Sequence, residues 1–257
     1  MAQPPPVRVN PWAALGLTGN PFRRLDGEAL VRSLLEAADP DDRSPIRAWL
    51  RDDADVVQFI GQAGWGKSTR LVACHTVAVA EDRGGCRFDY IPLGTRHITI
   101  PPKGRTELPR LWSLDEVNRL TPRCRRQLAR WAAAYGVRLL LGTHDDVVGD
   151  MEAAGLRVRT VRLQPADRAA IARFIKRRRE LSATAPDTGT RLRVTEAAVR
   201  LVCDDAAGNL SRAEYVLYEA AQHAVEQIHR GAHMLMLDMP QIRGALQALA
   251  ARGATGV

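Results

Sequence analysis

The stretch that decides the fold is Gly61-Gln62-Ala63-Gly64-Trp65-Gly66-Lys67-Ser68, followed by Thr69 and preceded by the β-favouring run 55–60. It matches the pattern Gly-x-x-x-x-Gly-Lys-Ser at every defined position. Glycines at these positions let backbone N–H groups converge on phosphate oxygens, where a Cβ would be in the way. A helix that begins near Lys67 adds the positive end of its dipole. The stretch therefore predicts a phosphate-binding loop between a strand and a helix.

The side chains of this loop, together with an acidic pair further along, predict ATP and Mg²⁺ as ligands. Lys67 places a positive charge on the β- and γ-phosphates, and the Ser68 hydroxyl is a magnesium ligand. Asp115 and Glu116 follow the apolar run 111–114. At the end of a neighbouring strand Asp115 would hold magnesium-bound water, and Glu116 would orient and deprotonate the attacking water.

Two further positions are candidates for sensing the nucleotide. The expected strand 137–141 ends in Gly142-Thr143-His144, where Thr143, and less so His144, would contact the γ-phosphate. Arg212 lies at the start of an expected helix and would face the nucleotide from there. The full set expected to contact the nucleotide is Gly61, Gln62, Ala63, Gly64, Trp65, Gly66, Lys67, Ser68, Thr69, Asp115 and Arg212.

The hydrophobic pattern predicts an α/β fold, a P-loop NTPase core with a parallel five-stranded sheet. Strands are expected at 55–60, 88–93, 111–114, 137–141 and 158–163, and helices at 28–38, from Lys67 and from Thr121-Pro122. Strands that alternate with helices imply a parallel sheet covered on both faces. From about residue 165 the pattern is purely helical, with helices expected at 166–181, 194–205, 209–229 and 239–251.

Three parts of the chain follow from this pattern. Residues 1–27 are expected to be an extended lead-in that lies across the core, with Trp12 and Phe22 as apolar anchors. Residues 28–164 are expected to form the α/β ATPase core, and residues 165–257 a helical lid.

Composition restricts the class of protein. The chain has 257 residues and a formal net charge of +8, almost all of it from arginine. This excess reflects either a GC-rich genome or an anionic partner such as nucleic acid. The four cysteines form no Cys-x-x-Cys pair, so neither zinc nor a disulfide framework is expected. There is no apolar run of about 20 residues and no secretory signal at the start, and we therefore expect a cytoplasmic protein without membrane insertion.

These motifs together resemble the AAA+ ATPases over about residues 50–230. The opening Gly16-Leu17-Thr18-Gly19-Asn20-Pro21-Phe22 is similar to the lead-in of a bacterial branch with transposition regulators and secretion-associated ATPases. The resemblance implies a nucleotide bound between the core and a helical lid. It also implies a homo-oligomer in which a neighbour's arginine reaches the γ-phosphate, with Arg157 and Arg159 as the candidates.

The resemblance is weakest in the segment 94–110. Family members usually have a helix there, but Pro101, Pro102 and Pro109 disfavour one, which argues against threading a polymer through a ring. The segment is nevertheless basic. Together with Lys176-Arg177-Arg178-Arg179 and the stripe Arg123, Arg126 and Arg130, it is a candidate for contact with a DNA backbone, although such runs are commonly only solvated surfaces.

Two functions stay open on the sequence. The first is a DNA-associated regulator of the transposition or target-selection type, in which ATP stabilises an oligomer on duplex DNA and slow, partner-stimulated hydrolysis releases it. The second is a nucleotide-controlled protein-interaction switch in secretion or phage defence, with Trp12 and Phe22 as its docking surface. A small-molecule kinase fits less well, because the helical second half suits a lid better than an acceptor-substrate domain.

Overall fold

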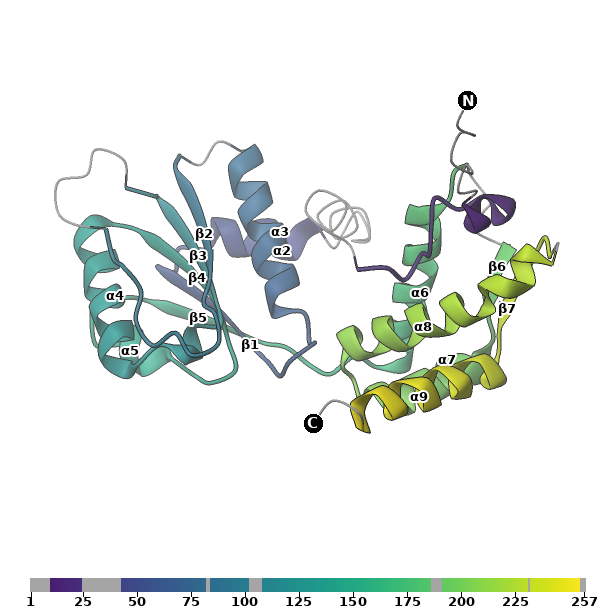
Figure 1. Ribbon diagram of the computed structural model, residues 1–257. Coiled ribbons are helices and arrows are strands. Elements are labelled where there is room, and N and C mark those ends of the chain that lie inside the picture. The colour runs from purple at the N-terminus through teal and green to yellow at the C-terminus, as the bar shows by residue number, and fades with distance from the viewer. Residues whose placement is uncertain are drawn as a thin grey trace, which may run out of the picture. The chain divides into compact units, whose positions relative to one another are not determined.

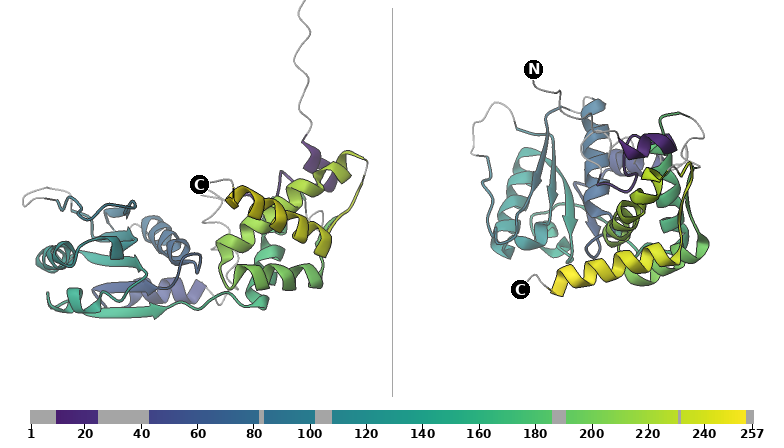
Figure 2. Two further views of the ribbon diagram at one scale, coloured as in Figure 1. Left: turned by 60° about the horizontal axis from the view of Figure 1, so that its bottom comes forward. Right: turned by 45° about the vertical axis from the view of Figure 1, so that its right-hand side comes forward.

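The computed structural model describes residues 10–24, 43–81, 84–101, 108–185, 191–230 and 232–254. The chain forms two compact units (Figures 1 and 2). Residues 26–165 make up the first, the α/β unit, and residues 1–25 and 166–257 make up the second, the helical unit. No helix in the described ranges is long and apolar enough to cross a membrane.

The α/β unit is built on a parallel five-stranded sheet of order β2-β3-β4-β1-β5, which confirms the predicted fold class. The strands are β1 (Val56–Ile60), β2 (Cys86–Tyr90), β3 (Leu111–Asp115), β4 (Arg138–Thr143) and β5 (Val158–Arg162). Every residue of β1 and β3 is buried, as expected for central strands of a sheet covered on both faces. β2 ends earlier than predicted, because Pro92 has no N–H with which to extend the ladder.

Helices lie on both faces of the sheet (Figure 1), and an apolar cluster fills the space between the helices and the sheet on each face. On one face α4 (Pro122–Tyr135) and α5 (Val148–Glu152) pack against Trp112, Leu139 and Leu141. On the other face α2 (Arg43–Arg51) and α3 (Lys67–Ala80) pack against Val57, Phe59 and Leu140. The unit is therefore a three-layer α/β/α arrangement.

Three details differ from the sequence-based expectation or fall outside it. The helix α2 was not expected, although Ile46, Trp49 and Leu50 have the spacing of an apolar helix face. The helix expected at 28–38 lies outside the described residues. Within the segment 94–110, the described residues contain no helix, in line with its prolines.

The helical unit contains η1 (Pro11–Leu15), α6 (Arg168–Ser182), α7 (Glu196–Ala206), α8 (Leu210–His229) and α9 (Met239–Ala254). The expectation of a purely helical second part was wrong, because β6 (Leu192–Val194) and β7 (Leu235–Leu237) form a parallel two-stranded sheet. Each strand has only three residues, which is too short to produce a readable alternation.

The lead-in belongs to the helical unit rather than lying across the α/β core, which corrects our expectation. Trp12 and Phe22 are 5% and 0% exposed and join the apolar cluster formed by α6 to α9. The Asn20 side chain donates hydrogen bonds to Tyr218 O (3.1 Å) and Gln222 Oε1 (3.0 Å). Residues 10–24 are thus an integral layer of the helical unit.

Candidate nucleotide-binding site

The loop of residues 61–66 joins β1 to α3 at the carboxyl end of the sheet. Gly64 and Gly66 have φ values of 78° and 86°, a left-handed conformation that glycine adopts without steric cost. A Cβ on Gly61 would lie 3.1 Å from the Trp65 ring and 3.2 Å from Leu163. The glycine spacing read from the sequence thus has a direct steric reason in the folded loop.

Lys67, the first residue of α3, is buried, and its ammonium is held inside this loop. Its Nζ donates to Gly61 O at 2.9 Å and to Gln62 O at 3.1 Å. Burial lowers the pKa of Lys67, and the nearby carboxylates of Glu116 and Asp115 oppose that shift. A buried ammonium bonded to loop carbonyls is well placed to exchange these neutral acceptors for phosphate oxygens.

Asp115 is the last residue of β3 and is 1% exposed. Burial raises the pKa of this carboxyl, while a hydrogen bond with Ser68 lowers it. Gly142 on the neighbouring strand makes room for Asp115: a Cβ there would collide with Oδ1 of Asp115 and would lie 2.7 Å from Leu71 Cδ1. Sequence reasoning missed this role of Gly142, and its only signal was a glycine at the end of an apolar run.

Ser68 and Asp115 are a donor set that suits magnesium. Both supply oxygen, which hard cations prefer, and a desolvated carboxylate gains most from a cation. In the described ranges no three His, Cys, Asp or Glu side chains gather as a metal cage. Magnesium at this place would therefore depend on these two side chains together with phosphate and water oxygens, as is usual for this ion.

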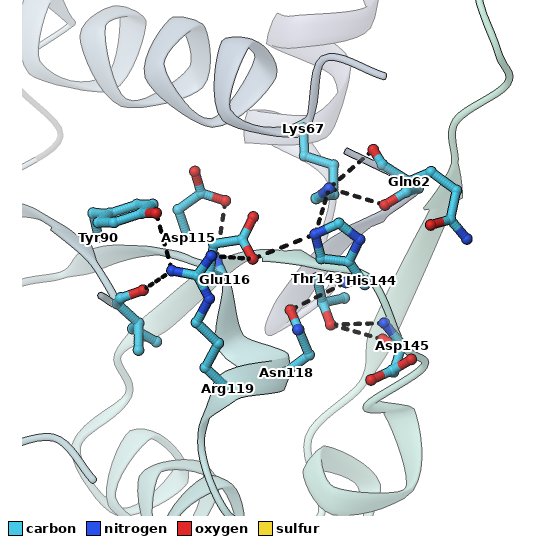
Figure 3. A network of polar contacts seen from close by, with 12 residues as sticks. Gln62, Lys67, Tyr90, Asp115, Glu116, Asn118, Arg119, Thr143, His144 and Asp145 are labelled. Atoms are coloured by element: carbon cyan, nitrogen blue, oxygen red, sulfur yellow. Dashed lines mark hydrogen bonds and ion pairs between the residues drawn. The ribbon is translucent and has the colours of Figure 1, made fainter. Parts of the chain in front are cut away.

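Glu116 has the left-handed backbone conformation (φ 65°, ψ 38°), which is uncommon for a residue with a Cβ. Its side chain lies between two cationic or basic groups at the carboxyl end of the sheet (Figure 3). Oε2 is 3.2 Å from Arg119 Nη2 and 3.3 Å from His144 Nε2. Conformations of this kind cost on the order of 1–3 kcal/mol and persist where surrounding contacts impose them.

The turn after β4 brings His144, and not Thr143, to the loop. The Thr143 hydroxyl donates to Asp145 O (2.8 Å) and accepts from Asp145 N (3.2 Å), so it closes its own turn. His144 Nε2 lies 3.3 Å from Lys67 Nζ, and Asn118 Oδ1 accepts from the His144 backbone N–H at 3.2 Å (Figure 3). The contact of Thr143 with a γ-phosphate stays a prediction, and His144 is the better placed of the two.

Arg119, on η2 (Val117–Arg119), was not a sequence candidate. Besides Glu116 it contacts Tyr90, whose hydroxyl accepts from Nη1 at 2.9 Å, and Ile91, whose carbonyl accepts at 2.6 Å. The three contacts fix the guanidinium beside the acidic pair (Figure 3). Its only sequence signal was its position three residues after Glu116.

The other predicted arginines lie away from this loop or in the other unit. Arg157 and Arg159 are at the amino end of β5. Because the strands are parallel, this end of the sheet is opposite to the carboxyl end, where the loop 61–66 lies. Arg157 pairs with Asp53 at 2.6 Å, and Arg159 pairs with Asp52. In the helical unit the Arg212 guanidinium donates to both carboxylate oxygens of Asp205, at 2.7 and 3.2 Å. Their roles stay predictions.

The fold is thus a five-stranded parallel sheet with a glycine-rich loop after β1, followed by a mainly helical unit. Solved structures share this fold with the chain. Domain III of the Thermotoga maritima replication initiation protein DnaA has a TM-score of 0.58 and 12% identity, covering 88% of this chain and 98% of that domain.

Two further structures have a similar fold. The Aeropyrum pernix ORC1 protein in complex with DNA has a TM-score of 0.54 and 17% identity, and the match covers 93% of this chain and 69% of the ORC1 chain. A mutant of Thermotoga maritima RuvB has a TM-score of 0.53 and 13% identity, covering 89% and 72%. No family model and no curated protein matches the sequence. At these identities the likeness concerns the fold alone.

Proposed function

We propose that the chain is an ATP-binding protein that hydrolyses ATP with magnesium. The observation that carries this proposal is that Lys67, Asp115 and Glu116 meet at one end of the sheet, beside the glycine-rich loop 61–66. Lys67 would neutralise the β- and γ-phosphates, and Ser68 and Asp115 would hold magnesium. Glu116 would orient and deprotonate the attacking water.

We further propose that the protein is a DNA-associated, oligomerising regulator, of the transposition or target-selection type, in the cytoplasm. The support is the net charge of +8 and the fold shared with a replication initiation protein and with an ORC1 protein solved in complex with DNA. ATP would stabilise an oligomer on duplex DNA, and hydrolysis would reset it. Arg157 or Arg159 of a neighbouring copy would complete the site, and Arg212 would sense the nucleotide.

The burial of the lead-in bears on the alternative, a protein-interaction switch in secretion or phage defence. That hypothesis used Trp12 and Phe22 as an exposed docking surface, whereas both lie in the apolar cluster of the helical unit. The docking surface that this hypothesis named is thereby removed, and we favour the DNA-associated regulator.

The test is ATP hydrolysis by the purified chain, with and without duplex DNA at low salt. We expect a slow basal rate that DNA stimulates, and a loss of hydrolysis of about 100-fold or more in Lys67→Ala and Glu116→Gln. Glu116→Gln should retain nucleotide binding, and Lys67→Ala should lose it. Lys176→Ala is the matched control, since the side chain of that lysine is 77% exposed. Hydrolysis that survives in both site variants would refute the ATPase assignment.

A further inference from the structure

The outer face of α4 carries an arginine stripe that the nucleotide site does not use. Arg123, Arg126 and Arg130 are exposed, while Cys124 and Leu128 on the opposite side of the helix are buried against the sheet. Because an α-helix rises 1.5 Å per residue, the stripe extends over roughly 10 Å. Measured along the DNA axis, that length corresponds to the rise of about three phosphates of one strand.

An extended segment, residues 96–101, runs beside α4 and adds to this stripe. Its two ends are tied to the helix: Arg96 O accepts from Thr121 N at 3.1 Å, and Pro101 O accepts from Trp131 Nε1 at 3.0 Å. Between them, Ile98 and Ile100 pack into the core. Arg96 and the intervening polar side chains are exposed. We call α4 and residues 96–101 together the α4 surface.

The α4 surface contains no acidic residue of its own, since none occurs in residues 91–101 or 121–135. Asp150 pairs with Arg125 at 2.6 Å and lies 3.7 Å from Arg126. In the part of the chain that the structure describes, Arg96, Arg123 and Arg130 have no carboxylate partner. Within the described residues, the positive charge of Arg96, Arg123 and Arg130 is therefore not balanced by an ion pair.

The other arginine-rich candidate, the run 176–179 in α6, forms ion pairs within the helical unit. Arg178 is 6% exposed and pairs with Glu214 inside the helical unit. Lys176 and Arg177 both lie within 3.9 Å of Glu180. The run 176–179 therefore offers less free charge to a partner than its sequence suggests.

We propose that the α4 surface docks on the phosphate backbone of duplex DNA. This inference rests on the proposed function and names its contact surface. Guanidinium groups are the side chains best suited to paired hydrogen bonds with phosphate. Among the described residues of this surface no Phe, Tyr or Trp side chain is exposed, with Tyr135 only partly so, and these are the side chains on which single strands stack. Binding through this surface is insensitive to base sequence and weakens steeply with salt.

The test compares two triple variants with the same net charge. R96Q/R123Q/R130Q removes three charges from the α4 surface, and R173Q/R200Q/R243Q removes three exposed charges from the helical unit. Binding to a random-sequence duplex of about 30 bp is measured by fluorescence anisotropy over a salt series, with nucleotide. We expect the α4 variant to bind DNA at least about 10-fold more weakly than the wild type, and the slope of log K against log salt concentration to be smaller in magnitude by about 3. The affinity of the control variant should stay within about twofold of the wild type.

Each other result overturns the assignment in a recognisable way. Equal loss in both triple variants would mean that only net charge matters, and no loss in the α4 variant would exclude this surface. If polyglutamate at equal charge displaced the wild type as well as DNA does, the surface would serve an acidic protein instead. If the wild type itself bound no duplex in any nucleotide state, the DNA-associated function would fail with it. Retained ATP binding shows that the variants are folded.

Discussion

At the scale of single residues, adjacent carboxylates have different surroundings. Asp115 is enclosed by the sheet beside Gly142, and burial dominates its environment. Glu116 lies one residue further along with a left-handed backbone, which turns its side chain toward Arg119 and His144. One peptide unit thus separates a desolvated carboxylate, suited to a cation, from a partly accessible one, suited to a water molecule.

The raised pKa of Asp115 predicts that its charge destabilises the ligand-free protein. A protonated Asp115 contributes stability that is present below its ordinary pKa of 3.8 and is lost as the pH rises through its folded-state pKa. Asp115→Asn should therefore increase the free energy of unfolding by about 1 kcal/mol at neutral pH. This gain in stability should vanish as the pH falls toward 3.8, where the wild-type carboxyl is also protonated. Asp115→Asn should in addition lose magnesium-dependent ATP hydrolysis at every pH. Chemical denaturation at several pH values measures it, and a destabilised variant at neutral pH would contradict the argument.

Gly142 gives a second prediction, with a matched control. Gly142→Ala would place a methyl group against Asp115 and Leu71, which should cost about 1–3 kcal/mol and weaken nucleotide binding. Gly149 is in α5, and a Cβ added there would have nothing within 4 Å, so Gly149→Ala should stabilise by roughly 0.5–1 kcal/mol. Thermal unfolding of the two variants would show opposite shifts. Similar shifts in both would mean that the space beside Asp115 is not restricted.

At the scale of elements, the lead-in is the clearest case of a segment whose partner is distant in sequence. Thr18 N donates to Ser182 O at 2.8 Å, and Asn20 reaches α8, about 200 residues away along the chain. Phe22 belongs to the same apolar cluster as the long helices. The first described residues and the last four long helices therefore form one folding unit, although the whole α/β unit lies between them in the sequence.

This arrangement predicts that Phe22 stabilises the helical unit. Phe22→Ala should cost about 3–5 kcal/mol, because the side chain is fully buried. Leu93→Ala removes a side chain that is 88% exposed, and it should change stability by less than about 0.5 kcal/mol. Hydrogen exchange resolved by peptide locates the effect: faster exchange in α6 to α9 is expected, with little change in the five-stranded sheet. Uniform exchange across both units would disprove the assignment of the lead-in.

At the scale of the whole molecule, nucleotide binding should be visible as stability. ATP with magnesium at about 100 times its dissociation constant should stabilise the site by about 2.7 kcal/mol. Differential scanning fluorimetry should show the shift in the wild type and in Lys176→Ala, but not in Lys67→Ala. A shift that persists in Lys67→Ala would place the nucleotide elsewhere.

The sequence by itself determined the strand–loop–helix at 55–80, the acidic pair Asp115-Glu116 at the end of β3 and the order of the main helices and strands. These features are local: phosphate binding needs contiguous backbone N–H groups, and amphipathic periodicity is read within one element. The parallel sheet followed from the alternation of strands and helices, because parallel strands require crossover connections.

Only the tertiary structure decided which side chains meet. His144 reaches Lys67 and Glu116 because β4 pairs between β3 and β1, and Gly142 matters because that register sets it against Asp115. The lead-in and the β6–β7 ladder likewise depend on partners far away in the chain. The physical reason is the same in each case: burial and contact across strands are properties of packing, and no window of sequence contains both partners.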